Sequence, residues 1–466
     1  MDQNRHSHRG GNLIPEGWAE TTLSKIAAVN PKNGELNSLL SGFIPMTLAP
    51  TDFNGHLEFE EREWDEIKKK YTHFANGDVI FAKVTPCFEN GKAAIVSDLP
   101  NGIGAGSSEF YVLRPLDKGI SASYIFANIK SHEFMQTGAE NMTGAVGLRR
   151  VPRKFVEEFK VNLPPPAEQK VIADKLDTLL AQVETTKARL DRIPQILKTF
   201  RQSVLAAAVS GKLTEEWYTE TKKLLDVADF QNGYAFKSGW FLNDGSYQVI
   251  KLGNIRDGRL ALENSPAYID ESVAMEFSKF GPQQGDTLIS MTGTRFKKDY
   301  GFGCLIGNQQ GLLINQRVGR LIPKRTLVTP EYLNIFIRSD LFRDQFFEGE
   351  TGGVNQGNVG SKHVMTISIE LPNIDIQAEI VRRVEQLFAH ADKIEQQVQA
   401  AQQRVDRLTQ SILAKAFRGE LTAQWRKDNP DLISGDNSAE ALLAKIKAER
   451  EAKSPKKKVK TKKAKA

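Results

Sequence analysis

Two polar segments in the second half of the chain hold side chains suited to hydrogen bonding with nucleic-acid bases and phosphates. TGTRFKKDYG (292–301) places basic residues around Phe296, and TGGVNQGNVGSK (351–362) is rich in amides. Arg can donate two hydrogen bonds to guanine, an amide suits adenine, and Lys neutralises phosphate. The candidate contacts are Thr292, Thr294, Arg295, Lys297, Lys298, Tyr300, Asn355, Gln356, Asn358 and Lys362. A solvated hairpin is the alternative for the first segment, and a helix N-cap with a phosphate clamp is the alternative for Ser361 and Lys362.

Two segments at corresponding places in the first half are basic instead. They are KVTPCFENGK (83–92) and TGAVGLRRVPRK (143–154). Their candidate contacts are Lys83, Thr85, Asn90, Lys92, Arg149, Arg150, Arg153 and Lys154. Basic residues in one half and amides in the other favour two surfaces that read different sequences.

Motifs that carry out reactions are missing. VSGKLT (209–214) resembles the end of a phosphate-binding loop, but Ala206 and Leu213 stand where that loop needs Gly and Ser or Thr. LPPP (163–166) lacks the acid or amide and the aromatic residue of an amino-methyltransferase motif. No glycine-rich cofactor fingerprint is present, and the seven histidines are scattered. These absences argue against an enzyme; a methyltransferase or nuclease with degenerate motifs stays the alternative.

The sequence segments that must position these residues occur twice in the chain. SVLAAAVSGKLTEEW begins at Ser203 and SILAKAFRGELTAQW at Ser411, an offset of 411 − 203 = 208. The same offset relates GDVIF (77–81) to GDTLI (285–289) and Gln169 to Gln377. An internal repeat with so long a period indicates tandem domains rather than a solenoid. Before each long helical stretch, short Val-, Ile- and Phe-rich runs broken by Gly and Pro predict a mixed domain of strands and a few helices.

Each half then continues into a heptad pattern, which predicts two long helices paired as an antiparallel coiled coil with a pseudo-two-fold relation. The predicted seam is Ile172, Leu176, Leu179, Val183 and Leu190 in the first helix and Ile380, Val384, Leu387, Ile394, Val398, Val405 and Leu408 in the second. Pro194 predicts an interruption near Ile193, with a shorter continuation to Val209. Gly211 and Gly419 follow the helices where a C-capping glycine belongs. An ordinary amphipathic core helix is the alternative for each helix taken alone.

Overall charge is a poor guide to partners. The formal net charge is +6, but the segment from Lys453 holds eight lysines and no acids, so the remainder carries 6 − 8 = −2. A disordered, solubilising tail is the main interpretation of that segment, with weak phosphate contact as the alternative. We find no run of about 18 apolar residues and no secretory leader, and Cys87 and Cys304 are the only cysteines. A cytoplasmic location without membrane contact is therefore expected.

The repeated segments resemble a known family. LIPEGW (13–18), LPPPAEQKVIADKLDTLL (163–180) with its continuation to Trp217, and QAEIVRRVEQLFAHADKI (377–394) with its continuation to Arg426 are similar to the specificity (S) subunit, HsdS, of type I restriction-modification systems of the enterobacterial K-like group. GDVIF and GDTLI match the strand that recurs in that family's recognition domains. The likeness covers nearly the whole chain, and the two helical segments are its most specific part.

The resemblance implies an α+β chain with two target recognition domains. Each would read one half of a bipartite site in double-stranded DNA, while the helices fix the gap and dock two modification (M) subunits. Such a chain is not an enzyme and binds no cofactor or metal: S-adenosylmethionine belongs to the M subunits, and ATP and Mg belong to the restriction (R) subunits. The predicted segments are a disordered N-terminus (1–12), recognition domain 1 (13–162), a central helical spacer (163–217), recognition domain 2 (218–370), a distal helical spacer (371–425) and a helical, Lys-rich tail (426–466).

Overall fold

The computed structural model describes residues 14–34, 39–145, 147–214 and 219–453. It divides into two compact units: a first unit up to Arg189 that is completed by the residues from Ala401 onward, and a second unit, Leu190–Ala400. The division falls inside two long helices, α6 (Pro166–Val209) and α12 (Ile374–Phe417). The predicted boundaries between domains and spacers therefore stay predictions. The predicted N-terminal tail (1–12), the part of the predicted C-terminal tail (426–466) from residue 454 on, and Trp217 lie outside the described residues.

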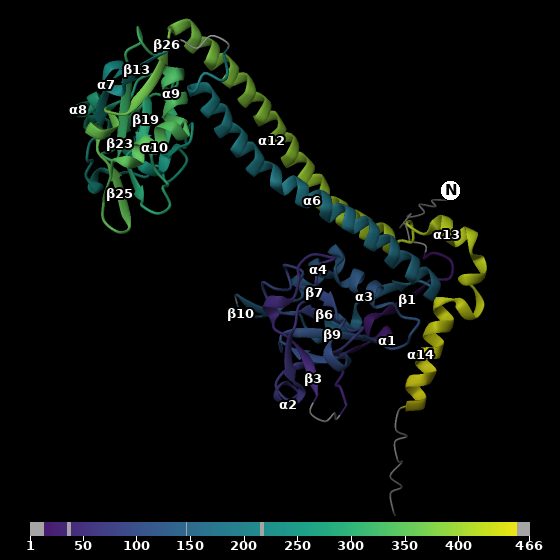
Figure 1. The fold of residues 1–466 in the computed structure, drawn as a ribbon. Coiled ribbons are helices and arrows are strands. Elements are labelled where there is room, and N and C mark those ends of the chain that lie inside the picture. Colours follow the sequence, from purple (N-terminus) through teal and green to yellow (C-terminus); the bar gives the residue numbers. More distant parts are fainter. Residues whose placement is uncertain (1–13, 35–38, 146, 215–218, 454–466) are drawn as a thin grey trace, which may run out of the picture. The chain divides into compact units, whose positions relative to one another are not determined.

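The first unit holds a mixed domain built on two four-stranded sheets (Figure 1). One sheet has the order β2 (Ala27–Val29), β9 (Phe110–Pro115), β6 (Val79–Ala82) and β7 (Ala93–Ile95). The other has the order β4 (Glu60–Glu63), β3 (Leu40–Ile44), β8 (Ile103–Gly106) and β5 (Thr72–Ala75). Helices α3 (Ala122–Ile129) and α4 (His132–Glu140) follow the first sheet. Each of these helices begins with a serine whose side chain accepts a backbone N–H of the first turn, as an N-cap does.

The second unit repeats this topology. Its main sheet has the order β14 (Ala228–Asn232), β23 (Val318–Pro323), β19 (Thr287–Ser290) and β21 (Gly303–Leu305). A smaller sheet has the order β18 (Tyr268–Ile269), β15 (Tyr247–Ile250) and β22 (Leu312–Ile314). Helices α9 (Pro330–Arg338) and α10 (Asp340–Glu348) follow the main sheet. The alternation of short strands and helices confirms the predicted α+β class in both halves.

Buried hydrogen bonds recur at the 208-residue offset. The Tyr124 hydroxyl donates to the Asn162 carbonyl at 2.5 Å, and the Tyr332 hydroxyl donates to the Glu370 carbonyl at 2.9 Å. Gln169 and Gln377, both fully buried, each accept a backbone N–H from the residue before a helix and donate to a Pro carbonyl five positions earlier. These bonds tie the start of each long helix to its domain, so the helix direction is set by the domain that precedes it.

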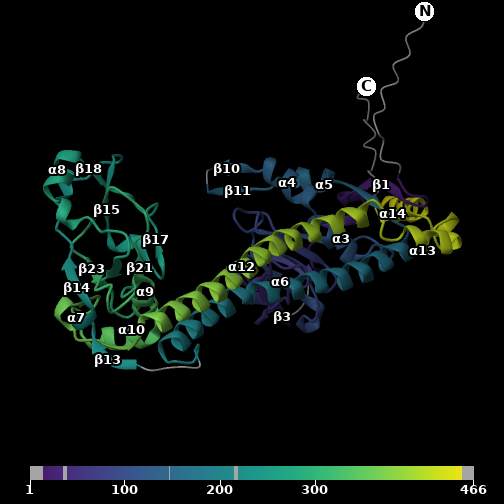
Figure 2. The ribbon, with the colours of Figure 1, turned by 90° about the horizontal axis from the view of Figure 1, so that it is seen from above.

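Helices α6 and α12 run antiparallel, side by side, in both views (Figures 1 and 2). In the first unit, Ile172, Leu176 and Val183 of α6 pack with Ile412 and Ala416 of α12. In the second unit, the later residues of α6 share a core with the earlier residues of α12, namely Val204, Leu205, Ala208 and Val209 with Ile380 and Val384. Each unit therefore contains its own stretch of the predicted helix pair.

The glycines after the two helices have the predicted capping role. Gly211 and Gly419 have φ of +79° and +72°. The N–H of Lys212 bonds to the Ala207 carbonyl at 3.1 Å, and that of Glu420 bonds to the Lys415 carbonyl at 2.9 Å. These are the six-to-one bonds of a Schellman motif, which needs a left-handed residue just past the helix end. The repeated segment that holds these glycines thus forms the C-terminal end of a helix and is not a phosphate-binding loop.

The predicted interruption near Ile193 is wrong. Helix α6 is continuous across Pro194. A proline inside a helix lacks an N–H and leaves the carbonyl four residues earlier without its bond. Pro194 is exposed and Leu190 is only half-buried, so water can reach the region that lost the bond. The helix therefore continues at an energetic cost instead of breaking.

The seam also departs from the predicted heptads at two places. Leu408, predicted in the seam, is 47% exposed, whereas Leu413 is buried. In α6, Leu179 is only partly buried and its neighbour Leu180 is fully buried. In the first unit the helices also pack on the domain, so their buried faces are wider than a two-helix stripe. The remaining predicted seam positions are buried or half-buried.

The segment after α12 is a structural part of the first unit rather than a simple tail. Thr422, Arg426 and Trp18 all donate hydrogen bonds to the fully buried carboxylate of Glu168, near the start of α6. Helix α13 (Ala423–Asp428) follows, and then α14 (Ala439–Lys453), which lies beside α1 (Leu23–Ile26) in Figure 1. None of the helices in the described ranges is long and apolar enough to cross a bilayer.

Candidate nucleic-acid interface

In the second unit, the two polar segments predicted separately form one small sheet. Strands β20 (Thr292–Thr294), β25 (Gln356–Val359) and β24 (Glu350–Gly352) lie in that order and are antiparallel. Thr292 lies opposite Asn358 and Thr294 lies opposite Gln356. Strand β20 follows directly on β19 of the main sheet, which gives the small sheet a rigid base.

Amide side chains face outward from the central strand of this sheet. Gln356 and Asn358 are exposed, whereas Gly357 and Val359 between and beside them are buried. This alternation follows from the two-residue period of a β-strand. Asn355, at the start of the strand, is exposed as well. Three exposed amides that can bond to a base edge therefore lie on β25 and the residue just before it.

The basic residues lie at the tip of the same sheet. Arg295 donates to the carboxylate of Glu350 at 3.1 Å, and its backbone N–H reaches the Asn355 carbonyl at 3.4 Å. Lys297 and Lys298 are exposed. Lys298 adopts a left-handed φ of +45° and lies over the Phe347 ring, with 4.9 Å between its ammonium and the ring centroid.

Two apolar side chains project from this tip among the basic ones. Phe296 is 70% exposed and Val354 is 81% exposed. Apolar side chains at such a position can pack on thymine methyl groups or insert between bases. The sequence pattern pointed to Phe296 but not to Val354, because a single valine among glycines and amides carries no signal of exposure.

Two predicted contacts of this unit are wrong. Tyr300 is fully buried, its ring stands edge-on to Phe346 and Phe347, and its hydroxyl donates to Glu350 at 2.5 Å. Burial and, after it, the neighbouring carboxylate raise the pKa of Tyr300. Thr292 is only 8% exposed and its hydroxyl oxygen is buried. Both residues support the sheet from beneath, so neither can reach DNA.

The other two predicted residues of this unit differ in availability. Thr294 is half-buried, and its hydroxyl and backbone N–H both donate to Asp299, which closes the loop. Lys362 is exposed in the short helix α11 (Ser361–Val364). Thr294 thus shapes the loop, whereas Lys362 extends from a short helix at the surface.

In the first unit, the two predicted segments also come together, around a hairpin. Strands β10 (Thr143–Ala145) and β11 (Leu148–Arg150) form it. The Thr85 hydroxyl accepts the Arg149 N–H at 3.0 Å, and the Thr85 N–H donates to the Arg149 carbonyl at 3.0 Å. Thr85 therefore fixes the hairpin to the domain. Leu148 in this hairpin is 52% exposed, which its apolar character did not predict.

The basic residues around this hairpin are matched by carboxylates. Glu109 accepts a bidentate pair of hydrogen bonds from Arg150 and lies 4.0 Å from Lys83. The bonds from Arg150 hold the pKa of Glu109 below its ordinary value. The remaining pairs are Arg149 with Glu89, Arg153 with Glu157, and Lys154 with Glu158. Exposed pairs of this kind contribute about 0–1 kcal/mol each, so exchanging a carboxylate for a phosphate or base costs little.

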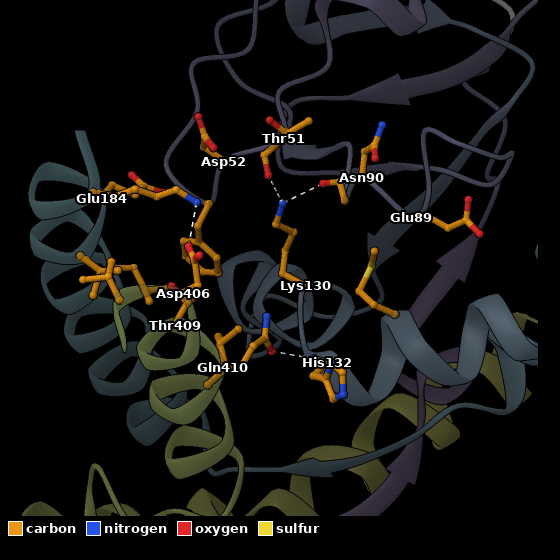
Figure 3. Close-up of a pocket in the computed structure, with 18 residues that line it drawn as sticks. Thr51, Asp52, Glu89, Asn90, Lys130, His132, Glu184, Asp406, Thr409 and Gln410 are labelled. Atoms are coloured by element: carbon orange, nitrogen blue, oxygen red, sulfur yellow. Dashed lines mark hydrogen bonds and ion pairs between the residues drawn. The ribbon is translucent and has the colours of Figure 1, made fainter. Parts of the chain in front are cut away.

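Two other predicted residues of the first unit lie away from the hairpin. Lys92 donates to the Met46 carbonyl at 2.8 Å and so holds a loop of its own domain. Asn90 lines a hollow of about 370 Å³ that also touches Glu184 on α6 and Asp406 on α12 (Figure 3). Neither residue belongs to the surface that the hairpin presents.

Lys130 projects into this hollow (Figure 3). It donates to the carbonyls of Thr51 and Gly91 at 2.6 and 2.7 Å. Burial lowers the pKa of Lys130 to about 8, and the Asp52 and Glu184 carboxylates act weakly in the opposite direction. With its ammonium used on two backbone carbonyls, Lys130 stabilises loops rather than binding a ligand. In the described part of the chain, no three His, Cys, Asp or Glu side chains converge as a metal site.

The two candidate surfaces share one backbone plan. Thr143 lies opposite Arg150 in the first hairpin, and Thr351 lies opposite Asn358 in the second, at an offset of 208 for both partners. Gly144 and Gly352 occupy the next position with φ of +127° and +120°, which favours glycine. The same scaffold thus presents Arg in one half and Asn in the other.

The comparisons with known proteins agree with this arrangement. The family model described as "Type I restriction modification DNA specificity domain" matches residues 15–195 and 215–401. The chain is 36% identical to the EcoKI specificity subunit of Escherichia coli K12 over 95% of this chain and 98% of that relative. It is also 36% identical to the StySPI specificity subunit of Salmonella potsdam over 94% and 96% of the two chains.

Solved structures show the same fold. The HsdS subunit of Thermoanaerobacter tengcongensis superposes with a TM-score of 0.58 at 18% identity, over 89% of this chain and all of that one. A chain from a study of complex assembly and conformational transition of the type I R-M system gives a TM-score of 0.66 at 18% identity, over 87% and 99%. Through its two matches to the family model and its relatives of 36% identity, this chain belongs to the family of type I restriction-modification specificity subunits.

Proposed function

We propose that this chain selects the DNA sequence on which a type I restriction-modification complex acts, and that each of its two domains reads one half of a bipartite target. The observation that carries the proposal is the pair of hairpins with one register and different outward residues. Leu148 and Arg150 in β11 stand where Gln356 and Asn358 stand in β25. Recognition of two different half-sites requires the same backbone arrangement in both domains with different side chains facing the bases.

The helices α6 and α12 serve in this proposal as spacer and docking platform. Each has 44 residues, which at 1.5 Å per residue makes a rod of roughly 66 Å. A stiff pair of helices can set the length of the unread gap between half-sites, which a flexible linker cannot. Two M subunits would dock on this chain and R subunits would join them.

The chemistry of the complex belongs to the partners in this proposal. The M subunits would bind S-adenosylmethionine and methylate adenine, and the R subunits would use ATP and Mg. Purified chain incubated alone with labelled S-adenosylmethionine and DNA is expected to transfer no methyl groups. Robust methyl transfer without partners would instead support the alternative, an enzyme with degenerate motifs.

Mapping of N6-methyladenine by long-read sequencing tests the main proposal. Cells expressing this chain with its M subunit are expected to carry methyladenine in a single two-part motif with an unread gap. In a variant whose residues 354–358 are replaced by a Gly-Ser loop of equal length, one half of the motif should relax while the other half persists. Methylation without a two-part motif, or relaxation of both halves together, would refute the proposal.

A further inference from the structure

Helix α14 covers one surface of the first domain. Its Leu442 and Ile446 are buried in the same core as Leu23 and Ile26 of α1 and Ile120 of the loop after β9. The apolar residues of α14 thus complete a core that the domain alone leaves open. Burying two large aliphatic side chains contributes about 1.5–3 kcal/mol each.

Close contacts and polar bonds fix α14 in place. A Cβ at Gly119 would lie only 2.9 Å from Leu442 and 3.4 Å from Pro166. Lys445 lies 2.8 Å from the carboxylate of Asp117, which lowers the pKa of Asp117. At the far end, Arg450 donates to the Ser24 carbonyl at 3.0 Å. Three positions of the domain therefore contact α14, namely Ser24, Asp117 and Gly119, and Pro166 lies beside Gly119.

The second domain has a corresponding surface, and none of the helices in the described ranges covers it as α14 covers the first. Helix α7 (Leu224–Val227) corresponds to α1, because the two helices begin with equivalent hydrogen bonds. The Leu23 N–H donates to the Phe159 carbonyl, and the Leu224 N–H donates to the carbonyl of Ile367, 208 residues after Phe159. Leu225 therefore corresponds to Ser24. The 208-residue offset pairs Leu327 with Gly119 and Ile374 with Pro166.

Large apolar residues stand at these positions, in place of Ser, Gly and Pro, and they are partly exposed to solvent. Leu225, Leu327 and Ile374 are 46%, 44% and 38% exposed. We call these three residues the uncovered patch. Hydrogen bonds hold it together: Lys324 donates to the Leu225 carbonyl at 3.0 Å, and Gln377, one turn after Ile374, donates to the Leu327 carbonyl at 2.9 Å. Exposed apolar side chains that form a contiguous surface can serve as an interaction site.

The charge at the edge of the patch is reversed. Asp117, which receives Lys445 in the first unit, corresponds to Arg325. Arg325 is exposed and donates to the Gln284 carbonyl at 2.7 Å. A helix seated here as α14 is seated on the first domain would need a carboxylate where α14 has Lys445. Helix α14 of a second copy would bring Lys445 toward Arg325, and like charges disfavour that complex.

We propose that the uncovered patch binds an amphipathic helix of a modification subunit, with an apolar stripe over Leu225, Leu327 and Ile374 and a carboxylate facing Arg325. This inference rests on the proposed function, which supplies the partner. A single helix buries less surface than a stable interface needs, so the patch strengthens a larger contact rather than forming one alone. It also makes the two halves unequal, because α14 already occupies the corresponding surface of the first domain.

Photo-crosslinking identifies the occupant. A photoreactive phenylalanine analogue replaces Leu327 in the full chain, which is purified in complex with its modification subunit and irradiated. The expected product joins residue 327 to an acidic, amphipathic helix of the modification subunit, as read by mass spectrometry of the crosslinked peptides. A product that joins two copies of this chain, or irradiation that yields no intermolecular product, overturns the proposal.

Surface substitutions measure the contribution of the patch. The double variant Leu225→Ser with Leu327→Ser, and separately Arg325→Asp, should each weaken binding of the modification subunit at least tenfold in titrations followed by sedimentation. The matched control is Leu341→Ser, since Leu341 is 43% exposed on α10 outside the patch. Unchanged affinity of both variants, with normal site-specific methylation by the wild-type complex, overturns this inference alone. Loss of site-specific methylation in the wild-type complex itself overturns the proposed function instead.

Discussion

Gln356 and Asn358 point out of β25 because Gly357 and Val359 face the core in alternation with them. Replacing both amides with Ala should leave the sheet intact and remove discrimination at the bases they contact, by about 1–3 kcal/mol for each lost two-pronged contact. Methyladenine mapping should then show one relaxed half-site. Gln136→Ala, an exposed amide on α4, is the matched control and should change nothing. An unchanged motif in the double variant would show that β25 does not read DNA.

Lys130 leads to a prediction about pH. Its pKa is lowered to about 8 in the folded chain from an ordinary value of 10.5. Between these values the unfolded chain binds the proton and the folded chain does not, so this residue makes stability rise as pH increases through that window. Urea unfolding at pH 7.5, 8.5 and 9.5 should show wild type gaining stability relative to Lys130→Met as the pH rises. Lys118→Met, at an exposed position, should show no such trend; a trend equal in both variants would contradict the assignment.

At this scale the sequence predicted the kinds of side chain well and their exposure poorly. Phe296 and Tyr300 stand four residues apart in one polar loop, yet one is 70% exposed and the other is fully buried. The difference arises from Phe346 and Phe347, which pack on Tyr300 from a distant helix. A local pattern holds no information about a partner that far along the chain. For the same reason the pairing of β20 with β25 could not be predicted.

Helix α6 runs through Pro194 without a break, so the proline is a defect that the fold tolerates. Pro194→Ala restores an N–H and removes the ring from the Leu190 carbonyl, and it should stabilise the helix by about 1–3 kcal/mol. Thermal unfolding followed by circular dichroism should show a higher midpoint. Gln195→Ala, at the next exposed position, is the control and should have a small effect. A lower midpoint for Pro194→Ala would mean that the proline shapes a needed bend.

The paired helices also lead to a prediction about the gap in the DNA target. Because they are antiparallel, shortening the rod requires a deletion in both, for example residues 186–192 in α6 and 401–407 in α12. Seven residues remove about 10.5 Å of helix, or roughly three base pairs at 3.4 Å per step. The motif in methyladenine maps should keep its half-sites and shorten its gap. An unaltered gap would show that the helices do not set it, and a seven-residue deletion in α12 alone should disrupt assembly.

Elements were the most predictable level. The 208-residue offset places the ends of both long helices, and Gly211 and Gly419 close them as predicted. The seam was less predictable, because Leu180 and Leu413 also face the domain and are buried. A heptad pattern describes contact between two helices alone and does not account for a third surface.

On the scale of the whole molecule, α14 connects residues after 438 to the core of the first domain. Truncation after Ser438 should destabilise the first unit by several kcal/mol, through loss of Leu442 and Ile446 from that core. Hydrogen exchange followed by mass spectrometry should show faster exchange in α1 and β9 and unchanged exchange in β19 and β23 of the second unit. Truncation after Lys453 is the matched control and should leave both units unchanged. Equal exchange in the two truncated chains would refute a structural role for α14.

The docking of α14 was not predictable, because the repeat that guided the rest of the interpretation has no second copy of this helix. The sequence predicted a helical tail here but no surface on which the helix packs. Only the fold shows that Ala439, Leu442 and Ile446 share one buried side.

The discontinuous first unit also sets an order of events during synthesis. The second unit occupies one unbroken stretch, Leu190–Ala400, whereas the first needs residues on both sides of that stretch. Domains fold as units while the ribosome releases the chain from its N-terminus. We therefore expect the half that is translated first to keep the core around Leu23 and Ile26 open until α14 emerges. We also expect the later-coded domain to be complete first, and a pause in translation beyond residue 400 to leave the earlier one exposed to chaperones and proteases.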